Sequence, residues 1–188
     1  MSYWDTLGKS DEWYTPKHVF DALGCDFDVD VAHPKDCDTF VPAKKFITEN
    51  SLQRGWYGFA WMNPPFGGRN GLAPWLDKFF EHGNGIALVP DRTSTPWFRD
   101  AWSKADAVLF TPKLRFHRPD GTIGKSPSNG TALFGVGSRA LIALNRAHER
   151  GLGILGQPVK HSPSARSAPS FDPLLGSGGL PLEQGNEK

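Results

Sequence analysis

The sequence predicts a single α/β domain, in which a Rossmann-like, mainly parallel sheet with an antiparallel edge strand carries helices on both faces. Three observations favour this fold class. Short apolar runs alternate along the chain with amphipathic segments of helical period. Of the 188 residues, 38% are hydrophobic, which suffices for one core and little more. The composition then changes near Gln157 to Ser, Pro and Gly.

Short apolar runs predict the strands. The run 26–32 alternates polar and apolar side chains, whereas 85–90 is apolar nearly throughout and predicts a buried strand. Residues 113–118 and 130–136 are expected to pair as a hairpin-like edge around a long turn. The predicted strands cover residues 26–32, 45–47, 58–62, 85–90 and 107–110.

Four segments have the features of helices. Pro16 stands near the start of the first, and Gly24 closes it. The last is amphipathic, and we expect Ser138 to cap its N-terminus and Gly151 to end it. The predicted helices span residues 16–23, 72–82, 95–103 and 138–150.

The composition beyond Gln157 cannot bury enough apolar surface to offset the entropy of ordering it. We therefore assign residues 1–156 to the compact domain and residues 157–188 to a flexible, low-complexity tail. An arm that binds a partner is the alternative interpretation of the tail.

Charge and cysteine content exclude several classes of protein. The net charge of +1 excludes a bulk polycation, so contact with nucleic acid requires a local basic patch. Cys25 and Cys37 are too few for a disulfide framework, and with His33 they lack a fourth ligand and the spacing of a zinc site. We therefore expect no metal site. No signal peptide or long apolar span is evident, so we expect a cytoplasmic protein.

Residues 63–66, Asn-Pro-Pro-Phe, form the most informative motif because they directly follow the apolar run 58–62. The two prolines fix φ and favour an extended Asn63. The Asn63 side-chain oxygen and the Pro64 carbonyl can then accept both hydrogens of an exocyclic amino group. This stabilises the charge that develops as the nitrogen is methylated. Phe66 offers a face on which an extruded base stacks. The motif thus predicts methylation of an amino group on a base, with adenine the expected one.

An ordinary turn at a strand end is the alternative interpretation, since Asn-Pro and Pro-Pro are common in turns. The surroundings of the motif favour a site. Glycines at 67, 68 and 71 and a helical segment follow it, which places it at the carboxyl end of a strand. Open α/β sheets bind their ligands at that edge.

Four sequence blocks and their order carry a family resemblance. Together they resemble the phage-type DNA N6-adenine methyltransferases, a branch of the class I S-adenosylmethionine-dependent enzymes. The blocks are DEWYTP at 11–16, FDVDVA at 27–32, WMNPPF at 61–66 and LVPDRTSTPWF at 88–98.

The resemblance implies the class I methyltransferase sheet, S-adenosyl-L-methionine as cofactor and transfer to N6 of an adenine flipped out of double-stranded DNA. It further implies a bacteriophage or restriction–modification setting, and a monomer or weak dimer in a bacterial or phage-infected cell. The implied catalytic residues are Asn63, Pro64, Pro65 and Phe66. The implied cofactor-binding residues are Thr15, Pro16, Asp30 and Asn63.

Asp30 lies near the end of the first predicted strand and is the expected cofactor anchor, because a carboxylate there can bind an ammonium group or ribose hydroxyls. A surface carboxylate is an equal alternative, and Asp28 competes because it points to the same face. The glycine-rich loop typical of class I enzymes is missing, and His-Pro-Lys-Asp stands at 33–36 instead. Glu49 or Asp36 is expected to hold the ribose.

Residues 135–140, Gly-Val-Gly-Ser-Arg-Ala, match a dinucleotide-binding fingerprint. No later strand carries the acidic residue that such a site needs. Close packing of a strand against a helix therefore explains these glycines better.

Basic residues are expected to contact DNA around one sheet edge. Lys113, Arg115 and His117 share a face if their segment is extended, and Arg69 follows the catalytic motif in a glycine-rich loop. Each residue alone fits solvated surface charge equally well, but the set favours phosphate contact. Further candidates are Arg92, Arg99, Arg118 and Lys125.

Two other functions are compatible with the sequence. One is a methyltransferase for another amine, namely cytosine N4, RNA adenine or a protein glutamine. The other is a non-catalytic nucleic-acid-binding protein that has lost the cofactor.

Overall fold

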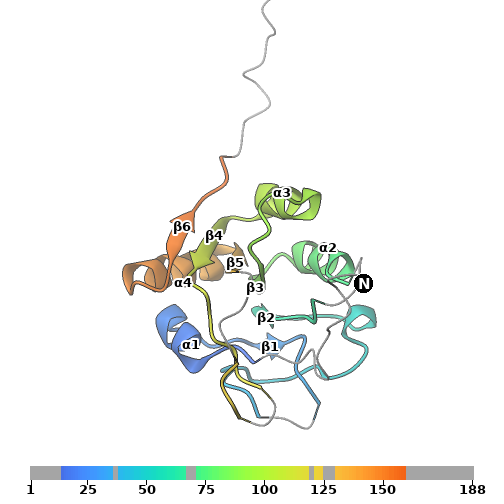
Figure 1. Cartoon of the computed structure of the whole chain (residues 1–188). Helices are drawn as coiled ribbons and strands as arrows, with labels where there is room; N and C mark the ends of the chain where they lie inside the picture. Colours follow the sequence, from blue (N-terminus) through green and yellow to red (C-terminus); the bar gives the residue numbers. More distant parts are fainter. Residues whose placement is uncertain (1–13, 36–37, 67–70, 119–120, 125–129, 160–188) are drawn as a thin grey trace, which may run out of the picture. The chain divides into compact units, whose positions relative to one another are not determined.

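The computed structural model describes residues 14–35, 38–66, 71–118, 121–124 and 130–159 (Figure 1). A compact unit ends at Pro158, and of the second unit, Val159–Lys188, the structure describes Val159 alone. The predicted tail therefore lies almost wholly outside the described residues. No helix in these ranges is long and apolar enough to cross a membrane.

Helices and strands alternate along the described chain. The helices are α1 (Lys17–Leu23), α2 (Ala73–His82), α3 (Pro96–Lys104) and α4 (Ser138–Glu149), with a short 3₁₀ helix η1 (Ser51–Gln53). The strands are β1 (Val29–Asp30), β2 (Ala60–Met62), β3 (Gly85–Pro90), β4 (Ala107–Thr111), β5 (Thr131–Val136) and β6 (Ile154–Gly156). The predicted helices are confirmed to within one or two residues at each end, whereas β1 is much shorter than the predicted strand.

The strands form one sheet in the order β1-β2-β3-β5-β4-β6. The pairs β1–β2 and β2–β3 are parallel, whereas β3–β5, β4–β5 and β4–β6 are antiparallel. The expectation of a mainly parallel sheet is therefore correct only for the half that holds β1, β2 and β3. The antiparallel β5 is an inner strand rather than the edge strand that was expected, and all of its residues but the last are buried.

The predicted hairpin between residues 113–118 and 130–136 is wrong. β5 pairs with β3 on one edge and β4 on the other, and its continuous apolar run fits an inner strand whose two faces are both covered. The 113–118 segment instead reaches the N-terminal part of the chain, where His117 forms an antiparallel bridge with Tyr14. The edge strand β6 follows α4 and was not predicted.

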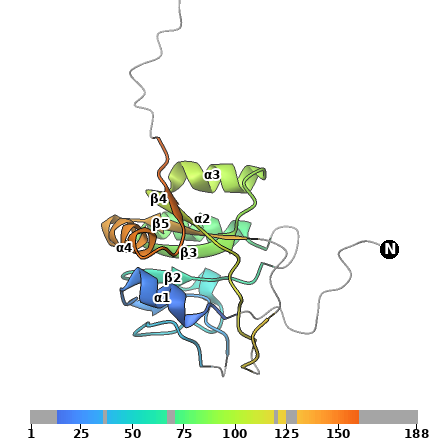
Figure 2. The same ribbon diagram turned by 60° about the vertical axis from the view of Figure 1, so that its left-hand side comes forward.

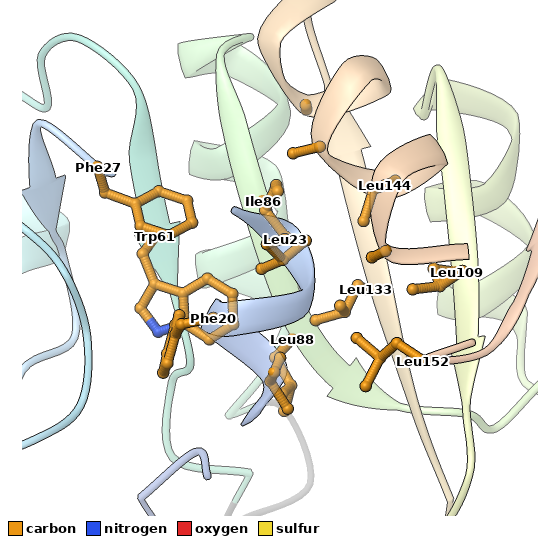
Figure 3. Packing of buried hydrophobic residues seen from close by; sticks show 14 of the residues in the cluster. Phe20, Leu23, Phe27, Trp61, Ile86, Leu88, Leu109, Leu133, Leu144 and Leu152 are labelled. Atoms are coloured by element: carbon orange, nitrogen blue, oxygen red, sulfur yellow. The ribbon is translucent and has the colours of Figure 1, made fainter. Parts of the chain in front are cut away.

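Helices cover both faces of the sheet, as the sequence predicts. Residues of α1 and α4 pack in one core cluster, which includes Phe20, Leu23 and Leu144. Residues of α2 and α3, such as Phe79 and Phe98, pack in a second cluster on the other face. Figures 1 and 2 show the sheet between the two helix pairs, and Figure 3 shows Phe20 and Leu23 of α1 beside Trp61 of β2.

Glycines set two helix boundaries. Gly24 ends α1 in the left-handed conformation, with φ of 58°. At α4 the cap is Gly137 rather than Ser138, and its N–H donates to an Asp106 carboxylate oxygen at 2.8 Å. The glycines of residues 135–140 are expected from the sequence to allow close packing of a strand against a helix. This is confirmed for Gly135, because a Cβ there would lie 2.7 Å from Cδ1 of Leu144 on α4.

Strand direction decides where a site can form. β4 is antiparallel to β5, which is antiparallel to β3, so β4 runs the same way as β1, β2 and β3. The carboxyl ends of these strands therefore meet at one edge of the sheet. Asp30 ends β1 there, and Asn63 follows the last residue of β2.

Candidate active site

A hollow of about 770 Å³ opens at the carboxyl ends of β1 and β2. Its walls come from short stretches that are distant in sequence, at residues 14–15, 30–35, 39 and 41, 47–51, 61 and 63–66, with Trp75. The main lining residues are Tyr14, Thr15, Asp30, His33, Lys35, Thr39, Val41, Glu49, Asn63, Pro64, Pro65, Phe66 and Trp75.

The whole Asn-Pro-Pro-Phe motif lines this hollow. Pro64 is buried and Asn63 is half-buried, while Pro65 is exposed. Phe66 is 36% exposed, so part of its ring is accessible to a planar ligand. The motif thus lies at the wall of a cavity rather than in an outward turn.

Thr15 holds the side chain of Asn63. The Asn63 amide nitrogen donates to the Thr15 hydroxyl at 3.3 Å, and Thr15 is only 3% exposed. The contact joins the lead-in to α1 with the end of β2. Pro16 lies outside the lining of the hollow, and its carbonyl accepts the Val19 N–H at the first turn of α1.

Asp30 is buried at the end of β1 and lines the hollow. One carboxylate oxygen accepts the Ala32 N–H at 3.1 Å, and the other lies 3.0 Å from Nδ1 of His33. The His33 ring packs against Phe46 with centroids 4.3 Å apart. The backbone of Asp30 also bridges to Phe46, so residues 45–47 run beside β1, close to the predicted short strand.

Asp28 lies outside the hollow, which separates it from Asp30. Its carboxylate pairs with Lys44 at 2.8 Å and Arg139 at 3.0 Å, and accepts the Phe59 N–H. The hydrogen bond from Lys44, with that from Phe59, holds the pKa of this carboxyl well below its usual range. Asp28 therefore links the chain just before β1 to three distant residues, Lys44, Phe59 and Arg139.

A sequence model described as DNA N-6-adenine-methyltransferase (Dam) matches residues 6–142. The chain belongs to this family. Neither curated proteins nor solved structures give a match. Membership in the Dam family confirms the resemblance drawn from the four blocks, and supports DNA adenine methylation as the activity and DNA as the substrate.

Of the two carboxylates expected to bind ribose in this Dam-family chain, Glu49 lines the hollow and Asp36 lies outside the described residues. Glu49 pairs with Lys35 at 2.9 Å, and both side chains are exposed. This ion pair therefore lies at the solvent side of the hollow.

Several wall residues carry no role in the sequence-based prediction. Trp75 stands in the first turn of α2, and its ring stacks on Trp56 with centroids 6.3 Å apart. The helix after β2 and the motif begins at the same sheet edge as the hollow. Its position in the sequence could therefore have predicted Trp75 as a wall residue. Tyr14, Thr39 and Val41 reach the wall only through tertiary packing.

The structure gives the exposure of some of the residues predicted to contact DNA, and the contacts themselves stay a prediction. Lys113 and Arg115 are exposed and alternate with the buried Leu114 and Phe116, so the segment is extended as expected. Arg69 and Lys125 lie outside the described residues, whereas Arg92 and Arg99 are exposed around the start of α3.

No group of three or more metal-ligating side chains gathers in the described part of the chain. Cys25 is a free thiol whose pKa is raised by burial. Cys37 lies outside the described residues.

Proposed function

We propose that this chain transfers a methyl group from S-adenosylmethionine to the N6 amino group of an adenine extruded from double-stranded DNA. One observation supports this above the others. The complete Asn-Pro-Pro-Phe motif of a Dam-family chain lines a hollow that a buried carboxylate, Asp30, shares.

The hollow fits S-adenosylmethionine in size and chemistry. Its volume of about 770 Å³ lies within the range of roughly 300–1,000 Å³ that holds small ligands. Asp30 and Glu49 supply carboxylates that suit an ammonium group and ribose hydroxyls. Trp75 offers aromatic surface for a flat ring. When bound, S-adenosylmethionine supplies an electrophilic methyl group on a positively charged sulfur.

Asn63 and Pro64 would hold the amino group of the substrate base. The Thr15 hydroxyl accepts a hydrogen bond from the Asn63 amide nitrogen, and this directs the amide oxygen away from Thr15. With the Pro64 carbonyl, that oxygen accepts the two hydrogens of the adenine N6 and stabilises positive charge on the nitrogen. No separate base is needed, since the nitrogen becomes acidic once it carries the methyl group.

The adenine has to leave the DNA stack, because a base within a duplex cannot reach a hollow at a sheet edge. Phe66 would stack on the extruded base. Lys113 and Arg115 would bind DNA phosphates, and so would Arg69, which follows the motif in sequence. We assign the activity to residues 1–156, as a monomer or weak dimer in the cytoplasm of a bacterial or phage-infected cell.

The test is a transfer assay with tritiated S-adenosylmethionine on unmethylated plasmid, RNA and protein. We expect label in the plasmid, recovered as N6-methyladenine after digestion to nucleosides. Label in N4-methylcytosine, in RNA or in protein would assign another amine. DNA binding without any heat of S-adenosylmethionine binding in calorimetry would indicate a non-catalytic protein.

A further inference from the structure

Phe40 is an exposed aromatic residue at the rim of the hollow. Its side chain is 44% exposed, although its neighbours Thr39 and Val41 both line the cavity. The Phe40 ring meets the His117 ring edge-on, with centroids 5.2 Å apart and planes at 72°. One edge of the phenyl ring is therefore supported while much of its surface faces solvent.

The backbone of His117 is hydrogen-bonded to Tyr14, a residue of the wall of the hollow. Its carbonyl accepts the Tyr14 N–H at 2.9 Å, and its N–H donates to the Tyr14 carbonyl at 3.0 Å. Tyr14 itself lines the cavity and is buried. The two bonds hold the backbone of His117 beside Tyr14 at the wall of the hollow, and the Phe40 ring packs against the His117 ring.

The segment that carries His117 is basic on its exposed side. Lys113 and Arg115 are exposed, and neither makes an ion pair with any residue that the structure describes. The stretch 38–41, which carries Phe40, contains one acidic residue, Asp38. Figures 1 and 2 show the 113–118 segment leaving β4 and running toward the loops around β1.

We propose that Phe40 and His117 form a second DNA contact, which packs against the base pair next to the extruded adenine while Lys113 and Arg115 bind the flanking phosphates. This inference rests on the proposed function and adds the residues that stabilise the opened duplex. Removal of a base from the stack exposes the faces of its neighbours, and an apolar ring at that position offsets the loss of stacking. Cations on the same segment match the charge of the backbone.

The test compares Phe40→Ala and Phe40→Trp with wild type, and uses Ile142→Ala as a matched control. Ile142 is a 59% exposed apolar residue on α4, outside the lining of the hollow. The readouts are KM for DNA, KM for S-adenosylmethionine, and the fluorescence of a duplex with 2-aminopurine at the mapped target adenine.

Phe40→Ala is expected to raise KM for DNA about tenfold, in the range of one lost base–aromatic stack, and to reduce the 2-aminopurine signal. KM for S-adenosylmethionine should stay at the wild-type value. Phe40→Trp should retain both DNA readouts, and Ile142→Ala should match wild type throughout.

Unchanged DNA readouts in a folded Phe40→Ala protein would overturn the inference. So would equal rises in both KM values, since these would indicate damage to the wall of the hollow. Absence of methyl transfer by wild type contradicts the proposed function instead. Fluorescence anisotropy with a duplex that carries an unpaired adenine then tests the contact alone, and unchanged affinity in Phe40→Ala overturns it.

Discussion

Asp28 directly precedes β1 and Asp30 ends it, and the two carboxylates have different surroundings. Asp28 faces Lys44 and Arg139, so cations compensate its charge. Asp30 is buried against the Ala32 N–H and the His33 ring at the wall of the hollow. A carboxylate offers about four acceptor sites, and these two contacts leave capacity for a ligand. Position along the strand thus separates a stabilising carboxylate from a candidate binding one.

Among changes to residues that line the hollow with Asp30, Asn63→Ala is expected to have the largest effect. We expect kcat to fall by about 10²- to 10³-fold, because one of two acceptors for the developing charge is lost. Affinity for S-adenosylmethionine in calorimetry should remain close to wild type. Asn145→Ala on α4, whose amide donates to the Leu141 carbonyl, is the matched control and should keep wild-type kcat. Wild-type turnover in Asn63→Ala would refute the assigned role.

Asp30→Asn separates the two carboxylates directly. The change keeps the shape of the side chain but removes its charge. We expect the Kd for S-adenosylmethionine to rise by roughly 10- to 100-fold, the worth of one charged hydrogen bond. Calorimetry measures it, and Asp28→Asn is the control with unchanged Kd. Equal effects from both substitutions would remove the distinction between Asp28 and Asp30.

Thr15→Val tests whether the hydrogen bond to Asn63 orients the catalytic amide. The substitution preserves shape but loses the acceptor, and we expect kcat to fall about fivefold, as for one neutral hydrogen bond. Thr111→Val is the control, because that buried hydroxyl bonds to Thr131 within the sheet and should affect thermal stability alone. If both variants lowered kcat equally, Thr15 would have no special effect on Asn63.

The smallest effect is expected from Asp28→Asn, in stability rather than binding. The folded-state pKa of Asp28 is depressed, so the ionised form stabilises the fold above pH of about 4, and this contribution is lost as the pH falls through the folded value. At pH 7 the variant should melt about 2–4 °C below wild type. The gap should shrink on acidification below pH 4. A gap that is constant with pH would show that the charge of Asp28 does not stabilise the fold.

Local patterns were sufficient to predict part of the fold and of the site. The buried run of β3 and the amphipathic helices are visible in sequence, and Asn63 and Asp30 were found because they end strands. The neighbours of β5 could not be predicted, because strand pairing depends on residues far apart in the chain. Trp75 lines the hollow and Phe40 lies between two of its lining residues, Thr39 and Val41, and no motif links either aromatic residue to Asn63.

The insertion of β5 between β3 and β4 has a consequence for biosynthesis. β4 has no direct hydrogen-bonded contact with β3, so each strand presents an edge of unpaired backbone N–H and C=O groups until residues 131–136 leave the ribosome. Closing these edges requires a long-range pairing, which is slow to form. A nascent chain halted before β5 is therefore expected to depend on chaperones to escape aggregation.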